Sequence, residues 1–378
     1  MAKKIQSILV ISIVSGMLLL SACKDSYTRV QKSTDVNYKL SKAIEYYNKK
    51  KYYQAIPLFE ELMGLIKGDS RAEDVYFKYS NAEFEEKNYI IAAYHFKRFV
   101  EVYPESPLAE EALYKYALSF AKQSPTSDLE QVNTERGIEA YQYFINTYPM
   151  STRLALCNEQ IDKMRKKLEV KALAIGDLYY KTENYRAAAL SYKQALREFP
   201  EITDNERISF MILKSDYKFA SLSILEKKAD RYKDLIKDYK SFAEKYPTSK
   251  YIDEANKYLE SAKFEVINSQ FNFASISRLE SREKLYQDAI RSYNAYKNTL
   301  KVAKTKVAAD KLNEKMQFLI VKNNHLIVEN SDEVDKNRKI THFNEVYQKF
   351  IDNFASSKYK REAEKLYLNI NHKNVTKS

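Results

Sequence analysis

The most constraining feature of this sequence is a pattern that recurs along most of the chain. It consists of an aromatic residue, an alanine, a second aromatic residue and a proline, and one clear copy comprises Tyr89, Ala92, Phe96 and Pro104. A second copy has the same offsets, at Tyr185, Ala188, Tyr192 and Pro200. Offsets of three and seven residues place side chains on one face of an α-helix, and proline cannot continue a helix. The pattern therefore predicts a repeated helix that ends near each proline.

Five weaker copies extend the pattern over the rest of the chain. The copy at Tyr52 keeps the alanine and the following aromatic residue, as Ala55 and Phe59. The other weaker copies begin at Thr134, Tyr232, Tyr286 and Ile340. Successive starts lie 37 to 54 residues apart, which predicts longer helices or extended loops in some copies.

Small residues and prolines complete the pattern. Gly176 lies upstream of Tyr185, where a preceding helix would need a small residue to approach its neighbour closely. Pro149 and Pro247 stand at the proline offset of two of the weaker copies. The bulky rings are then expected to fill the groove beside each small residue, so that paired helices share one core.

The scarcity of turn-forming residues supports an all-helical chain. Only five glycines and seven prolines occur among 378 residues, and no two glycines have the spacing of a phosphate-binding loop. The composition therefore disfavours sheets with many tight turns, since such sheets need glycine and proline at those turns. Hydrophobic residues make up 44% of the chain, which is enough to build a core.

Connections between the predicted helices can be placed from the polar residues. Ser106 is expected to cap the helix that follows Pro104, with Pro107 at its first position. The main breaks are expected at residues 124–128, 200–205 and 330–339.

The repeated pattern resembles the tetratricopeptide repeat, in which two antiparallel helices form each unit. This resemblance implies an all-α, tetratricopeptide-like helical repeat superhelix, an α-solenoid of about five to seven two-helix units. We expect five units over residues 36–264 and a C-terminal helical extension of two degenerate units over residues 265–378. A single pair cannot bury its apolar face alone, so the units are expected to stack.

The N-terminus carries a predicted export signal. Lys3 and Lys4 precede an apolar run over residues 5–20, and Leu-Ser-Ala precedes Cys23. This arrangement resembles the bacterial lipobox and implies a signal peptide over 1–22, with lipid attached to Cys23. Two or more acyl chains would anchor the chain stably to a membrane. Residues 23–35 are then a short tether, and an ordinary secretory signal with a chance cysteine is the alternative.

Charge is distributed unevenly along the chain. The net charge is +12, and residues 265–378 hold 21 Lys and Arg against 14 Asp and Glu. The mixed arrangement is typical of a solvated surface, and an anionic membrane or an acidic partner is the alternative interpretation. The second cysteine, Cys157, lies in an apolar stretch and is expected to be a buried small side chain.

No set of residues indicates catalysis. The histidines fall in no metal-ligand spacing, at His95, His325, His342 and His372. Adjacent glutamates diverge on a helix and do not form an acid–base pair, and no serine nucleophile motif is present. We therefore expect no enzymatic activity, no metal and no cofactor. Tyrosine–lysine interleaving could stack bases, but the tyrosines fall at core positions of the repeat, so nucleic acid is not an expected partner.

Several segments resemble the BamD family, the tetratricopeptide lipoproteins of the outer-membrane β-barrel assembly machinery, in particular its Bacteroidetes-type members. The similar segments are residues 32–36, 53–62, 92–97 and 103–113. The resemblance covers about residues 20–264, and the C-terminal extension departs from the usual length of the family. It implies an outer-membrane location on the periplasmic face and a scaffold role.

The resemblance also implies two kinds of partner. Residues 36–123 would receive unfolded barrel precursors, because the N-terminal repeats of the family do so. Residues 185–264 would contact a periplasmic POTRA domain of a BamA-type protein. Only Cys23 is carried over as a functional residue. Exposed tyrosines in the N-terminal repeats would suit an extended peptide, because tyrosine buries a large area at a small entropy cost.

Two alternative functions fit the same architecture. One is a tetratricopeptide lipoprotein adaptor of another envelope complex, since the repeat is a general interaction surface. The other is a nutrient-binding lipoprotein similar to the SusD type. The absence of tryptophan and the short loops argue against a sugar platform.

Overall fold

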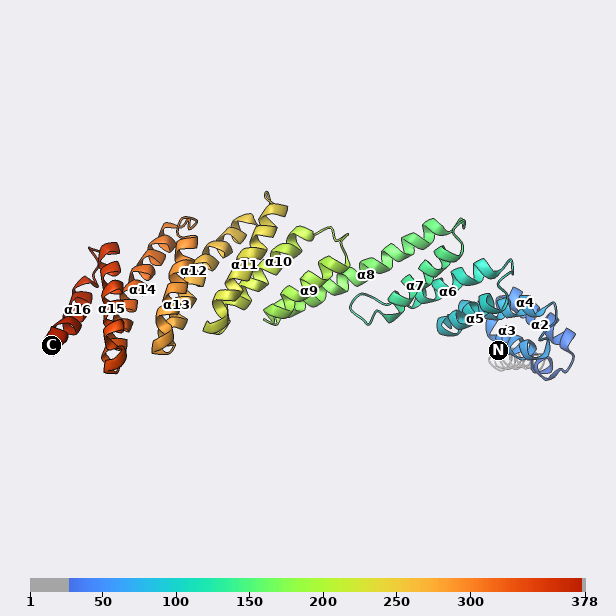
Figure 1. Ribbon diagram of the computed structural model, residues 1–378. Helices are drawn as coiled ribbons and strands as arrows, with labels where there is room; N and C mark the ends of the chain where they lie inside the picture. The colour runs from blue at the N-terminus through green and yellow to red at the C-terminus, as the bar shows by residue number, and fades with distance from the viewer. Residues whose placement is uncertain (1–26, 376–378) are drawn as a thin grey trace, which may run out of the picture. The chain divides into compact units, whose positions relative to one another are not determined.

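The computed structural model describes residues 27–375 and shows a succession of α-helices (Figure 1). The predicted signal peptide and Cys23 lie outside the described residues. The first helices are α2 (Val36–Asn48), α3 (Tyr52–Leu65), α4 (Ala72–Glu85), α5 (Tyr89–Val102), α6 (Ala109–Gln123), α7 (Val132–Thr147) and α8 (Leu154–Lys181). They are followed by α9 (Tyr185–Glu198), α10 (Asn205–Ser221), α11 (Leu225–Lys245), α12 (Ile252–Ile276), α13 (Leu279–Tyr296), α14 (Ala303–Glu329), α15 (Glu333–Asn353) and α16 (Lys360–Val375). Every regular element in this described part is helical, which confirms the predicted all-α, tetratricopeptide-like class.

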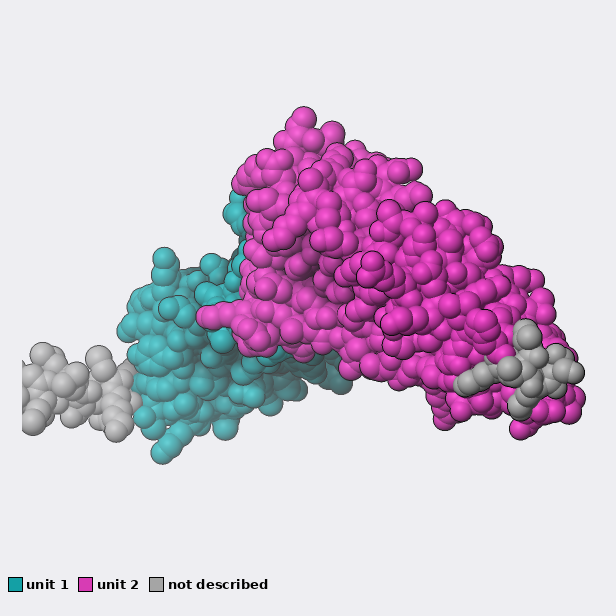
Figure 2. Space-filling model, turned by 90° about the vertical axis from the view of Figure 1, so that its left-hand side faces the viewer, with its two compact units in different colours: residues 1–171 teal, residues 172–378 magenta. Residues whose placement is uncertain are grey.

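The chain divides into two compact units, residues 1–171 and residues 172–378 (Figure 2). We call them unit 1 and unit 2. The division falls within α8, the longest helix of the described residues. Within the described part, consecutive helices form seven pairs, from α2 with α3 to α14 with α15, and α16 covers the last pair.

The recurring pattern marks the second helix of every pair. Three copies begin at the first helical residue, and the copy at Thr134 begins at the third. The last three begin at the eighth residue of their helices, at Tyr232, Tyr286 and Ile340. Two extra helical turns therefore precede the pattern in α11, α13 and α15, and these turns lengthen the repeat. The predicted border at residue 264 lies inside α12.

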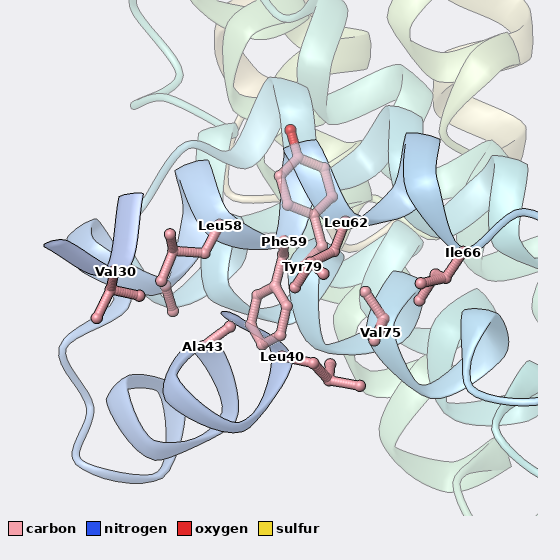
Figure 3. Packing of buried hydrophobic residues seen from close by; sticks show 10 residues of the cluster. Val30, Leu40, Ala43, Leu58, Phe59, Leu62, Ile66, Val75 and Tyr79 are labelled. Atoms are coloured by element: carbon pink, nitrogen blue, oxygen red, sulfur yellow. The ribbon is translucent and has the colours of Figure 1, made fainter. Parts of the chain in front are cut away.

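The core of unit 1 begins between the first helices. Leu40 and Ala43 of α2 face Leu58 and Phe59 of α3, and Val75 extends the contact to α4 (Figure 3). Each of these five side chains is buried. The pattern residues Ala55, Phe59, Ala92 and Phe96 have no exposed area. Their burial explains the pattern, because the alanine admits the neighbouring helix and the ring fills the remaining space.

Close packing in unit 2 explains Gly176. A Cβ atom at this position would lie 2.5 Å from Cε1 of Tyr192 and 2.6 Å from its Cδ1. The Tyr192 ring is fully buried against α8, and its hydroxyl donates a hydrogen bond to Oδ1 of Asp177. Ala188, one turn earlier on α9, is also fully buried. Only glycine leaves room for the ring at this crossing.

The connections between pairs have a constant length. Each runs six residues from the second helix of one pair to the next helix, at 66–71, 103–108, 148–153, 199–204, 246–251, 297–302 and 354–359. We call these segments joints. Pro104, Pro149, Pro200 and Pro247 are the second residues of four joints and stop the preceding helices as predicted. The long repeat spacings therefore come mainly from longer helices, together with the eight-residue loop 124–131 inside the third pair.

Two details of the predicted connections were wrong. Helix α6 begins at Ala109, so Pro107 lies in the joint rather than at the first helical position. Helix α15 begins at Glu333, so the break after α14 comprises only residues 330–332. Charged residues such as Asp335 and Arg338 are exposed on the first turns of α15, which shows why a polar stretch was mistaken for a loop.

A serine–glutamate hydrogen bond closes four of the seven pairs. In the joint after α11, Ser249 Oγ accepts from the backbone N–H of Tyr251 at 3.0 Å and donates to Oε1 of Glu206 at 2.6 Å. Glu206 belongs to α10, the first helix of the same pair. The same bonds join Ser106 to Glu73, Ser151 to Glu110 and Ser357 to Glu314. We call this arrangement the latch.

Candidate interaction surfaces

A groove opens in unit 1 between α5, α6 and α7. Its volume is 320 Å³, and Tyr116 and Phe120 of α6 line it together with Tyr94 of α5. Lys97 and Arg136 also line the groove, and no carboxylate does. The groove therefore offers apolar walls and positive charge, a combination that suits a polypeptide segment with aromatic and acidic side chains.

Apolar side chains stand exposed beside this groove. Ile90 is 75% exposed and Tyr94 is 65% exposed. They lie four residues apart on α5, so they share one helical face, while Ala92 and Phe96 on the opposite face are buried. Tyr53 on α3 is also 65% exposed. An exposed apolar surface of this kind is typical of an interaction site.

His95 lies beneath this surface among aromatic rings. Its Nδ1 is 3.3 Å from the Tyr76 hydroxyl, and its ring centroid is 4.8 Å from that of Tyr79. Burial lowers the pKa of His95 below its usual value, so the imidazole is neutral at neutral pH. The residue therefore supports the packing of α4 against α5 and adds no positive charge to the groove.

A half-buried cluster of charges lies between the first helices of unit 2. Lys193 Nζ of α9 lies 2.7 Å from Oδ2 of Asp238 in α11 and 3.1 Å from Oδ2 of Asp216 in α10. Burial raises the pKa of Asp216 to about 6 against the attraction of Lys193, and the neighbouring Asp238 adds to the rise. Burial lowers the pKa of Lys193, but its bonds to both carboxylates outweigh that effect and raise it. One ammonium thus holds three helices together.

Chemically reactive groups are sparse in the described residues. No group of three or more His, Cys, Asp or Glu side chains is placed to hold a metal ion in this part of the chain. Cys157 is buried, and burial raises the pKa of its thiol to about 11. None of the helices in the described part of the chain is both long and apolar enough to cross a bilayer.

The residues singled out from the sequence and the residues of the groove are different sets. The alanines and the second rings of the pattern lie in the cores, and the exposed prolines stop helices, so none of these positions lines the groove. Ile90, Tyr94 and Arg136, which line the groove, were not singled out individually. The sequence does carry one signal of this surface. Residues 89–93 read Tyr-Ile-Ile-Ala-Ala, so α5 is apolar on two faces, and only one of them can face the core.

Comparison with known proteins identifies the family. Residues 32–231 match the YfiO family, which is described as outer membrane lipoprotein and is the family of BamD. The match covers just over half of the chain. The chain belongs to this family. The match ends within α11, the second helix of the fifth pair.

Two relatives carry the BamD name. An outer membrane protein assembly factor BamD of Aquifex aeolicus is 24% identical over 295 residues, which cover 76% of this chain and 90% of that protein. The BamD of Caulobacter vibrioides is 25% identical over 118 residues, which cover 31% of this chain and 39% of that protein. Among solved structures, the TPR2AB domain of yeast Sti1 in a complex with an HSP90 peptide is 15% identical, with a TM-score of 0.29. That comparison covers 74% of this chain and 98% of the Sti1 chain.

Proposed function

We propose that this chain is a lipid-anchored scaffold of the outer-membrane β-barrel assembly machinery. Its membership of an outer membrane lipoprotein family and the names of its two relatives support this role. The lipid is placed on Cys23, the first residue after the predicted signal peptide. In this proposal the tether over residues 23–35 holds the helical pairs at the periplasmic face of the outer membrane.

The proposed task of unit 1 is to receive unfolded barrel precursors. The observation that carries this assignment is the exposed pair Ile90 and Tyr94 beside a cationic groove. An unfolded precursor has no fixed shape, so a binding surface gains from accessible apolar side chains and nearby charge rather than from a closed pocket. The groove extends the expected region slightly, because Arg136 lies beyond residue 123.

A peptide-binding measurement tests this assignment. We expect a labelled peptide from the aromatic last strand of a barrel precursor to bind the mature chain, and the Tyr94→Ser variant to bind at least roughly tenfold more weakly, because truncated aromatic anchors often cost over 1 kcal/mol. Tyr143 is 49% exposed on α7 and does not line the groove, so Tyr143→Ser is the matched control. Equal binding by both variants and the wild type would remove the assignment.

The proposed task of residues 185–264 is to contact a POTRA domain of a BamA-type protein. Exposed apolar residues support a protein contact here, since Leu190 is 57%, Leu222 70% and Ile224 67% exposed. The test is a mild-detergent pull-down of the anchored chain followed by mass spectrometry, with a Cys23→Ser chain as the control for anchoring. Recovery of a BamA-type barrel is expected. Recovery of a nutrient transporter or a division complex instead would assign the scaffold to another envelope assembly.

A further inference from the structure

A second cavity lies in unit 2, beyond the residues that match the family. It has a volume of 330 Å³ and opens between α12, α13 and α14. This volume is at the lower end of the range found for ligand sites, and it suits one large side chain with part of its backbone. Phe271, Tyr286, Leu319 and Leu326 give the cavity apolar walls.

Asn323 lines this cavity and has unsatisfied hydrogen-bonding atoms. The residue is only 3% exposed, and neither Oδ1 nor Nδ2 of its carboxamide has a hydrogen-bond partner. Its neighbour Asn324 is equally buried, but its Nδ2 donates to Glu283 at 2.8 Å and to the Ile320 carbonyl at 3.0 Å. Buried polar groups are nearly always paired in folded proteins. The free carboxamide of Asn323 is therefore the position at which a ligand would complete the structure.

The cavity is also lined by positive charge without any acidic residue. Arg282, Lys315 and Lys322 contribute to its lining. Lys322 Nζ is paired with Oε1 of Glu362 at 3.2 Å, whereas no acidic residue in the described part of the chain forms an ion pair with Arg282 or Lys315. Lys315 Nζ lies 5.0 Å from the centroid of the Phe271 ring. Arg282 Nε donates to the Ser277 carbonyl at 2.8 Å. Two cations without a carboxylate partner thus lie beside an apolar cavity.

We propose that this cavity binds an extended acidic segment of a partner protein, independently of the function proposed above. An apolar side chain of the segment enters between Phe271 and Leu319. The peptide group of that residue pairs with Asn323, because its N–H can donate to Oδ1 and its carbonyl oxygen can accept from the NH2 group of the carboxamide. Carboxylates on either side of the apolar residue reach Arg282 and Lys315.

The chemistry of the cavity favours a peptide over a simple anion. A sulfate ion offers acceptors only, so it would leave Oδ1 of Asn323 without a donor. The apolar walls would also remain uncovered. A peptide with an apolar side chain satisfies the carboxamide, the walls and the cations together.

The test measures binding of a blocked probe to the full mature chain. The probe is the peptide Asp-Glu-Phe-Glu-Asp-amide with a fluorophore blocking its amino end, and its binding is followed by anisotropy at low and high salt. We expect binding that weakens with salt, since Lys315 is exposed and salt screens its attraction to a carboxylate. We expect Lys315→Glu to lower the affinity at least roughly tenfold, as loss of a charge-assisted contact predicts. Lys311→Glu is the matched control, because Lys311 is exposed on the same helix and does not line the cavity.

Asn323→Leu gives a second test, in which stability and probe binding should change in opposite directions. The leucine has a similar size and removes the unpaired carboxamide, so the melting temperature should rise while probe binding falls. An analogue of the probe with Asn and Gln in place of Asp and Glu should bind more weakly. Equal affinities of the analogue and the acidic probe would overturn the proposal. Wild-type binding by Asn323→Leu, or no binding by the wild type, would overturn it as well.

Discussion

Replacing Gly176 by alanine should destabilise unit 2, although alanine is the better residue for a helix interior. The new Cβ would lie 2.5 and 2.6 Å from two atoms of the Tyr192 ring. That ring is fully buried and its hydroxyl is bonded to Asp177, so it cannot move away without cost. The predicted change is therefore a steric conflict at one helix crossing.

The magnitude follows from two opposing effects. Alanine gains about 1 kcal/mol over glycine within a helix. Overpacking of a filled core costs about 1–3 kcal/mol, and a contact shorter than 3 Å with a rigid ring belongs at the upper end. We expect a net loss of about 1–2 kcal/mol in the free energy of unfolding.

Two other glycines serve as internal controls. At Gly137 an added Cβ would lie 2.8 Å from Sδ of Met164, a flexible side chain that can turn away, so Gly137→Ala should be nearly neutral. At Gly64 no heavy atom lies within 4 Å of the added Cβ. Gly64→Ala should therefore stabilise unit 1 by about 1 kcal/mol.

Urea unfolding followed by circular dichroism gives the stability order of the three variants. Amide hydrogen exchange locates the effect, which for Gly176→Ala should be confined to peptides of α8 and α9. Adding Tyr192→Leu should make Gly176→Ala favourable, because the clash is absent and only the helix preference remains. A Gly176→Ala variant as stable as the wild type would refute the reasoning, as would a destabilised Gly64→Ala variant.

Three further predictions concern single side chains. The folded pKa of Asp216 is raised from 3.8 to about 6, so its contribution to stability is full below the lower value and is lost as pH rises to the higher one. This loss amounts to at most about 3 kcal/mol in the free energy of unfolding. Asp216→Asn should abolish it, as melting at several pH values across that window can measure. Ser249→Ala breaks its bond to Glu206 and should cost about 1–2 kcal/mol in thermal unfolding, whereas Ser241→Ala, at an exposed position of α11, should not. Cys157 should react with iodoacetamide much more slowly in the folded chain than in urea, as mass spectrometry can measure, and equal rates would contradict its burial.

The helices were predictable because their cause is local. Alanine and an aromatic residue at fixed helical offsets, followed by proline, give the second helix of each pair directly. The pattern at Tyr232 and Ile340 gave the face of each helix but not its start, because the added turns are polar and resemble a loop. Gly176 was also predictable as a point of close approach, since a small residue opposite a ring is the basis of the repeat.

The binding surfaces were less predictable because they depend on what the fold leaves uncovered. Ile90 and Tyr94 have the same composition as core residues, and only their position on the outer side of α5 leaves them exposed. Asn323 looks like one polar residue among several in α14. Its lack of a partner emerges only when α12, α13 and α14 are packed around it.

The latch has a consequence for how such a chain can change in length. Both of its members lie within one pair, because the glutamate is on the first helix and the serine is in the joint after the second. Loss or duplication of a whole pair, cut at the ends of its joints, leaves every other latch intact. Adding one residue to a joint ahead of its serine would separate the serine from its glutamate. Such a chain is therefore expected to gain or lose helices in whole pairs. The two pairs beyond the family match keep the same six-residue joints.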